Sequence, residues 1–234
     1  MIKTEEFVLR KSGREYQDKF SEHFYLRQLA KKKTKNNPRL TVKQAFLDDY
    51  ADRLSQLEFT RTRLGRFPKF LSSFHSALEK QGISRVAQFI YHLENYLAVV
   101  YIFDQRVKRL VKFVEKLAVK LGCPQADIEK VTDAKEILIA SVEPLVKVRG
   151  NHTHEKYFFD YALEEMEKYD KAGEFTTNLR ERKIFKNSAK TLLNLQRKRW
   201  KKDINGDIDK CEIQLGVLYA VLDKLVWQVH VRIK

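Results

Sequence analysis

Apolar residues recur at intervals of three and four along most of this chain, the spacing that gathers them on one face of an α-helix. Only eight Gly and four Pro interrupt the 234 residues, so few positions force the backbone out of a helix. No stretch alternates apolar and polar residues strongly enough to indicate a β-strand. The sequence therefore predicts an all-α fold, a helical bundle whose neighbouring helices are joined by short loops.

Start and stop signals place the first helices. Thr41 can cap a helix that reaches about Leu64, and a shorter helix carrying Phe70 and Leu78 follows. The longest periodic run predicts one long helix from Ser84 to about Leu121, which Gly122-Cys123-Pro124 would end.

Two interruptions divide the second half of the chain. Residues 127–131 are expected to form a short turn or helix, and the next helix should begin near Thr132. Pro144 should kink or restart that helix, leaving residues 143–154 on a short separate arm. The polar stretch 203–209 is expected to form a turn between a very basic helix and a last helix with a regular apolar seam. These two helices would make a basic C-terminal helical pair.

Composition indicates a cytoplasmic protein with a polyanionic partner. The net charge is +15, which nucleic acid or an acidic protein would neutralise. No apolar run approaches the roughly 18 to 20 residues of a membrane span, so no membrane association is expected, and no secretory signal is visible. The two cysteines form no CxxC pair and fit a reducing compartment. Residues 1–38 are predicted to form an N-terminal basic helix and a linker, and residues 39–234 the bundle.

One short segment concentrates groups that can transfer protons or bind phosphate near neutral pH. It contains Arg149, Asn151, His152, Thr153 and His154. On an ideal helix Arg149 and His154 would diverge by roughly 140°, so they meet only if the helix bends or starts here. Gly150-Asn151 is the expected place for such a break.

This segment resembles the signature of the HEPN (higher eukaryotes and prokaryotes nucleotide-binding) superfamily, in which an Arg is followed after four to six residues by a His within a helical bundle. Here four residues separate Arg149 from His154. Family members usually carry a polar residue directly after the Arg, whereas this chain has Gly150 there and Asn151 second.

The resemblance implies a metal-independent endoribonuclease of the toxin or defence type, acting as a homodimer that joins two motifs in one cleft. In that reading His154 is the general acid or base, Arg149 holds the phosphate and Asn151 orients the reacting groups. The partner would be RNA, and a neutralising antitoxin or another acidic protein could also bind. No cofactor is implied.

A structural role is the alternative for this segment: a capped helix junction in which Arg149 pairs with Glu155 and His152 is solvated. A metal site is not expected, because two His residues two apart on a helix diverge by roughly 200° and no second ligand cluster is present.

Basic clusters are the other candidate sites, and each run taken alone commonly forms a solvated helix face. Trp200 lies among five cations and could stack on an exposed base, although a Trp at such a position is also often part of a core. The residues predicted to bind RNA are Lys31, Lys32, Lys33, Arg197, Lys198, Arg199, Trp200, Lys201 and Lys202.

Two further functions remain open beside the nuclease. A non-catalytic helical adaptor would use only the cationic surface to bind RNA or an acidic protein. A structural protein would use the seam of the last helix, from Cys211 to Val229, as a coiled-coil dimer interface.

Overall fold

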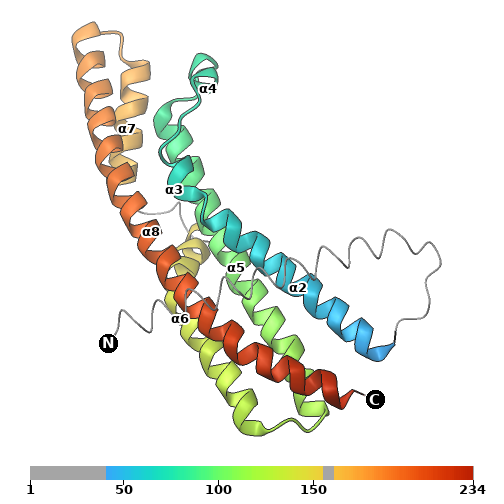
Figure 1. Ribbon diagram of the computed structural model, residues 1–234. Coiled ribbons are helices and arrows are strands. Elements are labelled where there is room, and N and C mark those ends of the chain that lie inside the picture. Colours follow the sequence, from blue (N-terminus) through green and yellow to red (C-terminus); the bar gives the residue numbers. More distant parts are fainter. Residues whose placement is uncertain (1–40, 155–160, 234) are drawn as a thin grey trace, which may run out of the picture. The chain divides into compact units, whose positions relative to one another are not determined.

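The computed structural model of this protein describes residues 41–154 and 161–233, and every regular element in these ranges is a helix (Figure 1). The prediction of an all-α fold is confirmed. The helices are α2 (Val42–Leu64), α3 (Phe67–Phe70), α4 (Ser76–Lys80), α5 (Arg85–Lys120), α6 (Gln125–His154), α7 (Tyr161–Phe175) and α8 (Leu179–Arg232). Among them, none is long and apolar enough to cross a lipid bilayer.

The boundaries of α2 and α5 follow the predicted signals closely, whereas the single short helix expected to carry Phe70 and Leu78 is divided into α3 and α4. The Thr41 backbone N–H donates to Gln44 Oε1 at 3.0 Å, and the Gln44 N–H donates to Thr41 Oγ1 at 3.3 Å, a reciprocal cap that starts α2. The predicted long helix is α5, which begins directly after Ser84. The Ser84 hydroxyl oxygen accepts a hydrogen bond from the Ala87 N–H at 3.1 Å. Gly122, with φ of 65°, lies just beyond its end.

The prediction of a turn at residues 203–209 is wrong, because these residues belong to α8, a single helix of 54 residues. The C-terminal helical pair is therefore a single helix. Ile204 is fully buried and lies four residues after the buried Trp200 and seven before the buried Cys211, so the apolar spacing continues across the polar stretch. Gly206 is tolerated there at a cost of about 1 kcal/mol relative to Ala.

The expected restart at Pro144 is also wrong. The helix α6 begins at Gln125, includes residues 127–131, and continues through Pro144 to His154. Pro144 and Ala140, whose carbonyl loses its hydrogen-bond donor to the proline, are both exposed. Water can therefore satisfy that carbonyl, and the helix tolerates the proline.

The described residues group into two compact units, which are described separately. The first unit takes its described residues from Met1–Phe59, Asp104–Ser141 and Asp209–Lys234. Its α6 and α8 segments are joined at Asp127, which accepts hydrogen bonds from Lys224 Nζ and Gln228 Nε2 at 2.8 Å each. Its core consists of aliphatic side chains from four helices, among them Leu54, Leu57, Val107, Leu110, Val114, Val131, Leu138, Leu218, Leu222 and Val229. The predicted division of the chain at residue 38 lies outside the described residues.

The second unit is formed by Thr60–Phe103 and by the described part of Val142–Ile208. Its α5 segment is tied to α7 by a hydrogen bond from Ser84 Oγ to Asp170, and to α8 by one from the Tyr96 hydroxyl to Asp207 at 3.3 Å. Its core includes Phe67, Leu71, Phe89, Leu93, Leu97, Leu163, Met166, Leu193 and Ile204. This unit contains the first half of α8.

Candidate nucleic-acid interface

The first half of α8 is overwhelmingly basic. Residues 179–202 contain ten Lys and Arg against a single acidic residue, Glu181. All ten cations are exposed except Arg197, which is half-buried. We call these side chains the α8 basic face: Arg180, Arg182, Lys183, Lys186, Lys190, Arg197, Lys198, Arg199, Lys201 and Lys202.

Helical spacing separates these cations from the core. Asn178 starts the helix, because its side-chain oxygen accepts hydrogen bonds from the backbone N–H groups of Arg180 at 3.0 Å and Glu181 at 3.4 Å. The buried side of the segment steps by three and four residues and consists of Ala189, Leu193, Gln196, Trp200 and Ile204. The cations occupy the remaining circumference.

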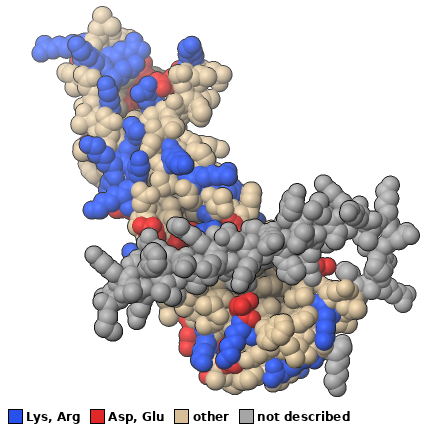
Figure 2. All heavy atoms as spheres, in the orientation of Figure 1, with Lys and Arg blue, Asp and Glu red and all other residues tan. Residues whose placement is uncertain are grey.

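Several cations share one stripe along the helix. Lys183, Lys186, Lys190, Arg197 and Lys201 follow one another at steps of three, four, seven and four, which keeps them within roughly 60° of one another on an ideal helix. At 1.5 Å per residue this stripe is about 27 Å long. Figure 2 shows Lys and Arg side chains gathered over the α8 part of the second unit, with few acidic side chains between them.

Few carboxylates neutralise this face. Arg199 Nε lies 3.8 Å from Asp203 Oδ2, which is a loose and exposed contact. Two glutamates of the neighbouring helix α7 pair within α7 instead, since Lys171 lies 2.7 Å from Glu167 and Lys168 pairs with Glu164. The hydrogen bonds and charge of Glu164 raise the pKa of Lys168. Lys183, Lys186, Lys190, Lys198, Lys201 and Lys202 form no ion pair with a carboxylate in the described part of the chain.

Helix α7 supports the start of α8 through close backbone contact. Arg182 Nε donates to the Gly173 carbonyl at 3.1 Å, and the Tyr169 and Phe185 rings stack with centroids 6.2 Å apart. A Cβ added at Gly173 would lie 2.9 Å from Lys186 Cγ, so only glycine lets the two helices approach this closely. The basic face is therefore held on a packed helix pair.

Two predicted RNA-binding residues make contacts within the second unit. Arg197 donates from Nε to the Leu71 carbonyl at 3.0 Å and from a terminal nitrogen to the Ser72 carbonyl at 3.3 Å. Its guanidinium carbon lies 4.9 Å from the centre of the Phe74 ring. Trp200 is only 9 % exposed, so the expectation that it stacks on a base is wrong. Its position on the seam of Leu193 and Ile204 is the signal that indicates burial.

The Arg149 to His154 segment lacks the expected break. The backbone is helical through Gly150 and Asn151 as far as His154, because a helix interior tolerates a single glycine at a cost of about 1 kcal/mol. Positions 149 and 154 of a continuous helix diverge by roughly 140°, so one chain does not bring Arg149 and His154 to a common face. The side chains of residues 149–154 and the whole of Glu155 lie outside the described part of the chain, as do Lys31, Lys32 and Lys33.

An exposed aromatic cluster lies elsewhere in the second unit, where the sequence predicts no site. Phe70 is 42 % exposed and Tyr91 is 62 % exposed, and the His92 ring lies next to both. Burial, and then the charge of His75, lowers the pKa of His92. We call these three residues the aromatic ledge. The signal in the sequence was Tyr91, an aromatic residue that lies outside the apolar face formed by Phe89 and Leu93 and is therefore exposed.

No group of three or more His, Cys, Asp or Glu side chains capable of holding a metal ion occurs among the described residues. Comparisons of the chain with protein families, with curated proteins and with solved structures found no match. The arrangement of residues is therefore the sole basis for a functional conclusion.

Proposed function

We propose that this protein is a non-catalytic, helical RNA-binding protein and that the α8 basic face contacts the phosphate backbone. The observation that carries the proposal is the ten-to-one excess of cations over acidic residues in 179–202, with six lysines that no described carboxylate pairs. Binding gains free energy when the lysines displace the counterions condensed on phosphates, and an RNA backbone supplies phosphates at regular intervals along its length.

An acidic protein fits this face less well than RNA. Charged residues are depleted at the centres of protein interfaces, where apolar and aromatic side chains dominate. The α8 basic face instead presents lysine and arginine over about 27 Å of helix. A partner with continuous negative charge matches that surface better than one whose carboxylates surround an apolar patch.

The test is the affinity for a fluorescent 20-nucleotide RNA, measured by anisotropy at low salt. Changing Lys183, Lys186 and Lys190 together to Glu should weaken binding about 100-fold, because three attractive contacts with phosphates become repulsive. The matched control changes Lys112, Lys116 and Lys120 of α5 to Glu, which alters the net charge equally from three exposed helix positions. Equal losses in the two variants would overturn the assignment to α8. Tighter binding of a DNA strand with the same base sequence would overturn RNA as the partner.

The nuclease hypothesis, with its homodimeric cleft, stays a prediction drawn from the resemblance. It needs a second copy of the chain to supply the partner group, because a continuous α6 separates positions 149 and 154 around the helix. The α8 basic face could bind RNA in a nuclease or in a non-catalytic protein. The non-catalytic protein does not require a second copy of the chain.

A further inference from the structure

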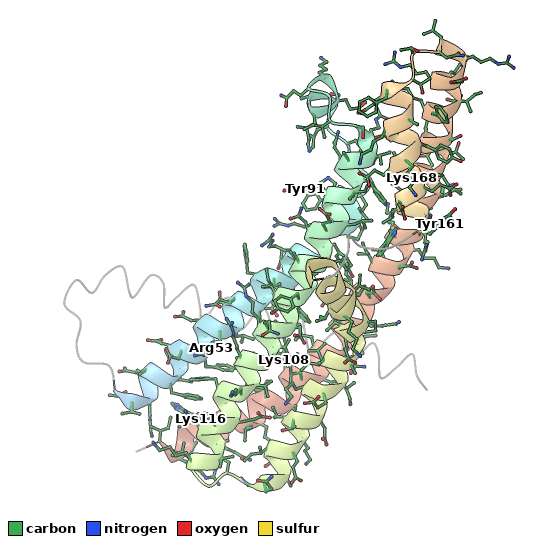
Figure 3. All side chains as sticks on the ribbon, turned by 180° about the vertical axis from the view of Figure 1, so that it is seen from behind. Arg53, Tyr91, Lys108, Lys116, Tyr161 and Lys168 are labelled. Atoms are coloured by element: carbon green, nitrogen blue, oxygen red, sulfur yellow. The ribbon has the colours of Figure 1, made fainter. Side chains whose placement is uncertain are left out.

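The aromatic ledge forms a continuous surface of three rings on α3 and α5. The Phe70 and His92 ring centroids lie 5.8 Å apart with 18° between their planes, a stacked pair. The Tyr91 ring centroid lies 5.9 Å from that of His92 with an interplanar angle of 57°. Figure 3 shows Tyr91 projecting from α5 into open space.

Buried aromatic side chains hold this surface in place. The buried Phe67 packs edge to face against Phe70 at 5.7 Å and against Tyr96 at 5.5 Å. Phe70 is therefore fixed from the inside while 42 % of its surface remains exposed. Because the ring is already ordered, little conformational entropy is lost when a ligand stacks on it.

Cations lie beside the ledge on the same short stretch of chain. Arg66 and Lys69 flank Phe67 and Phe70 of α3, and both side chains are exposed. The backbone that follows Phe70 is bound directly to α8, because Arg197 donates to the carbonyls of Leu71 and Ser72. The α8 basic face and the aromatic ledge are thus joined within the second unit.

We infer that the aromatic ledge binds unpaired bases and that the RNA ligand of this protein is single-stranded. The inference rests on the proposed function, since the α8 basic face holds the backbone. Bases within a duplex are already stacked on both faces, whereas an unpaired base has a free face for Tyr91 or Phe70. Aromatic rings next to a cationic track are the usual means of binding single strands without sequence preference.

The experiment compares a 20-nucleotide oligouridine, which has no internal base pairs, with a 20-base-pair RNA duplex in the same anisotropy assay. Tyr91→Ala should weaken binding of oligouridine about 5- to 100-fold, the loss of one stacked base, and leave duplex binding within about twofold. Tyr91→Phe keeps the ring and should bind oligouridine as the unchanged protein does. Tyr161→Ala is the control. Tyr161 is a similarly exposed tyrosine of the same unit, at 68 %, but it lies at the start of α7 and is not part of the aromatic ledge (Figure 3).

Unchanged oligouridine binding by Tyr91→Ala, or an equal loss for strand and duplex, would overturn the inference. If the triple Glu variant of α8 loses binding while Tyr91→Ala does not, the ledge inference fails and the proposed function stands. If the triple Glu variant also binds normally, the proposed function itself fails.

Discussion

Arg197 of α8 binds the carbonyl oxygen of Leu71, with Nε donating at 3.0 Å. The residues are 126 positions apart in the sequence, and the same guanidinium also covers the Phe74 ring. A side chain that the sequence pattern places on an RNA surface thus fastens the segment between α3 and α4 to α8.

We expect Arg197→Ala to lower the free energy of unfolding by about 1 to 3 kcal/mol, because two charge-assisted hydrogen bonds and a cation–π contact are lost. Arg197→Lys should recover little of this, since an ammonium group cannot reproduce the planar fork of donors. Urea unfolding measures the change, and the exposed neighbour Lys198→Ala should be within about 0.5 kcal/mol of the unchanged protein. If Arg197→Ala left the free energy of unfolding unchanged, the contact would contribute nothing to stability.

Gly206 tests whether α8 is continuous. A Cβ at this position meets nothing within 4 Å, and its φ is not positive, so Gly206→Ala should stabilise the protein by about 0.5 to 1 kcal/mol. Gly122→Ala is the counterpart, because a φ of 65° strains any side chain, and it should destabilise by about 1 kcal/mol. Thermal unfolding followed by circular dichroism distinguishes the two. Destabilisation by Gly206→Ala would favour a turn at residues 203–209.

Close packing of α7 on α8 should make Gly173 intolerant of larger side chains. Gly173→Val introduces a Cβ that would lie 2.9 Å from Lys186 Cγ and 3.4 Å from the Lys186 backbone nitrogen. We expect a loss of about 1 to 3 kcal/mol in the free energy of unfolding, the usual range for overpacking. A loss of less than about 0.5 kcal/mol, the usual scale of exposed-site changes, would show that the two helices separate easily there.

The pKa of His92 should be lower than 6.5, the ordinary value for histidine, because burial and then His75 disfavour its charged form. The folded state then binds a proton less readily than the unfolded state. The contribution of His92 to the free energy of unfolding should be constant well above pH 6.5 and should decrease as the pH falls below 6.5. Titration of the imidazole signals by NMR measures the pKa directly, and His92→Gln should lose this part of the pH dependence. A His92 pKa above 6.5 would contradict this effect of partial burial.

The resemblance to the HEPN signature gives a separate prediction, tested with pure protein and total RNA in EDTA. A nuclease centred on Arg149 and His154 would cleave RNA without metal, and His154→Ala would lose about 10²- to 10⁴-fold of that activity. The adaptor predicts that neither protein cleaves RNA. Equal cleavage by both would exclude His154 as the catalytic group.

The sequence was informative where periodicity alone decides the structure. The caps at Thr41 and Ser84 and the extent of α5 follow from local chemistry, and the structure confirms them. The restart expected at Pro144, the break at Gly150 and the turn at residues 203–209 are absent from the helical backbone. At residues 203–209, the burial of Ile204 on the seam of Trp200 and Cys211 outweighs the cost of about 1 kcal/mol for a glycine inside a helix.

The candidate sites divide in the same way. Lys198, Lys201 and Lys202 of α8 were predicted from the sequence, because they stand in one dense run of cations. Lys183, Lys186 and Lys190, which are spread along the helix, were not predicted. The role of Arg197 could not be predicted, because it depends on contacts with Leu71 and Phe74, which are distant in sequence. The burial of Trp200 is indicated by its place on the apolar seam of the helix. The ledge formed by Phe70, Tyr91 and His92 joins two helices and so leaves no local motif.

The dependence of RNA affinity on salt tests the central claim most directly. Six unpaired lysines on the α8 basic face predict that log K falls with log salt concentration with a slope of about −4 for a single strand. Changing Lys183, Lys186 and Lys190 to Glu should make the slope shallower, at about −2 or closer to zero. A flat profile for the unchanged protein, or the same slope in the variant, would contradict phosphate binding by α8.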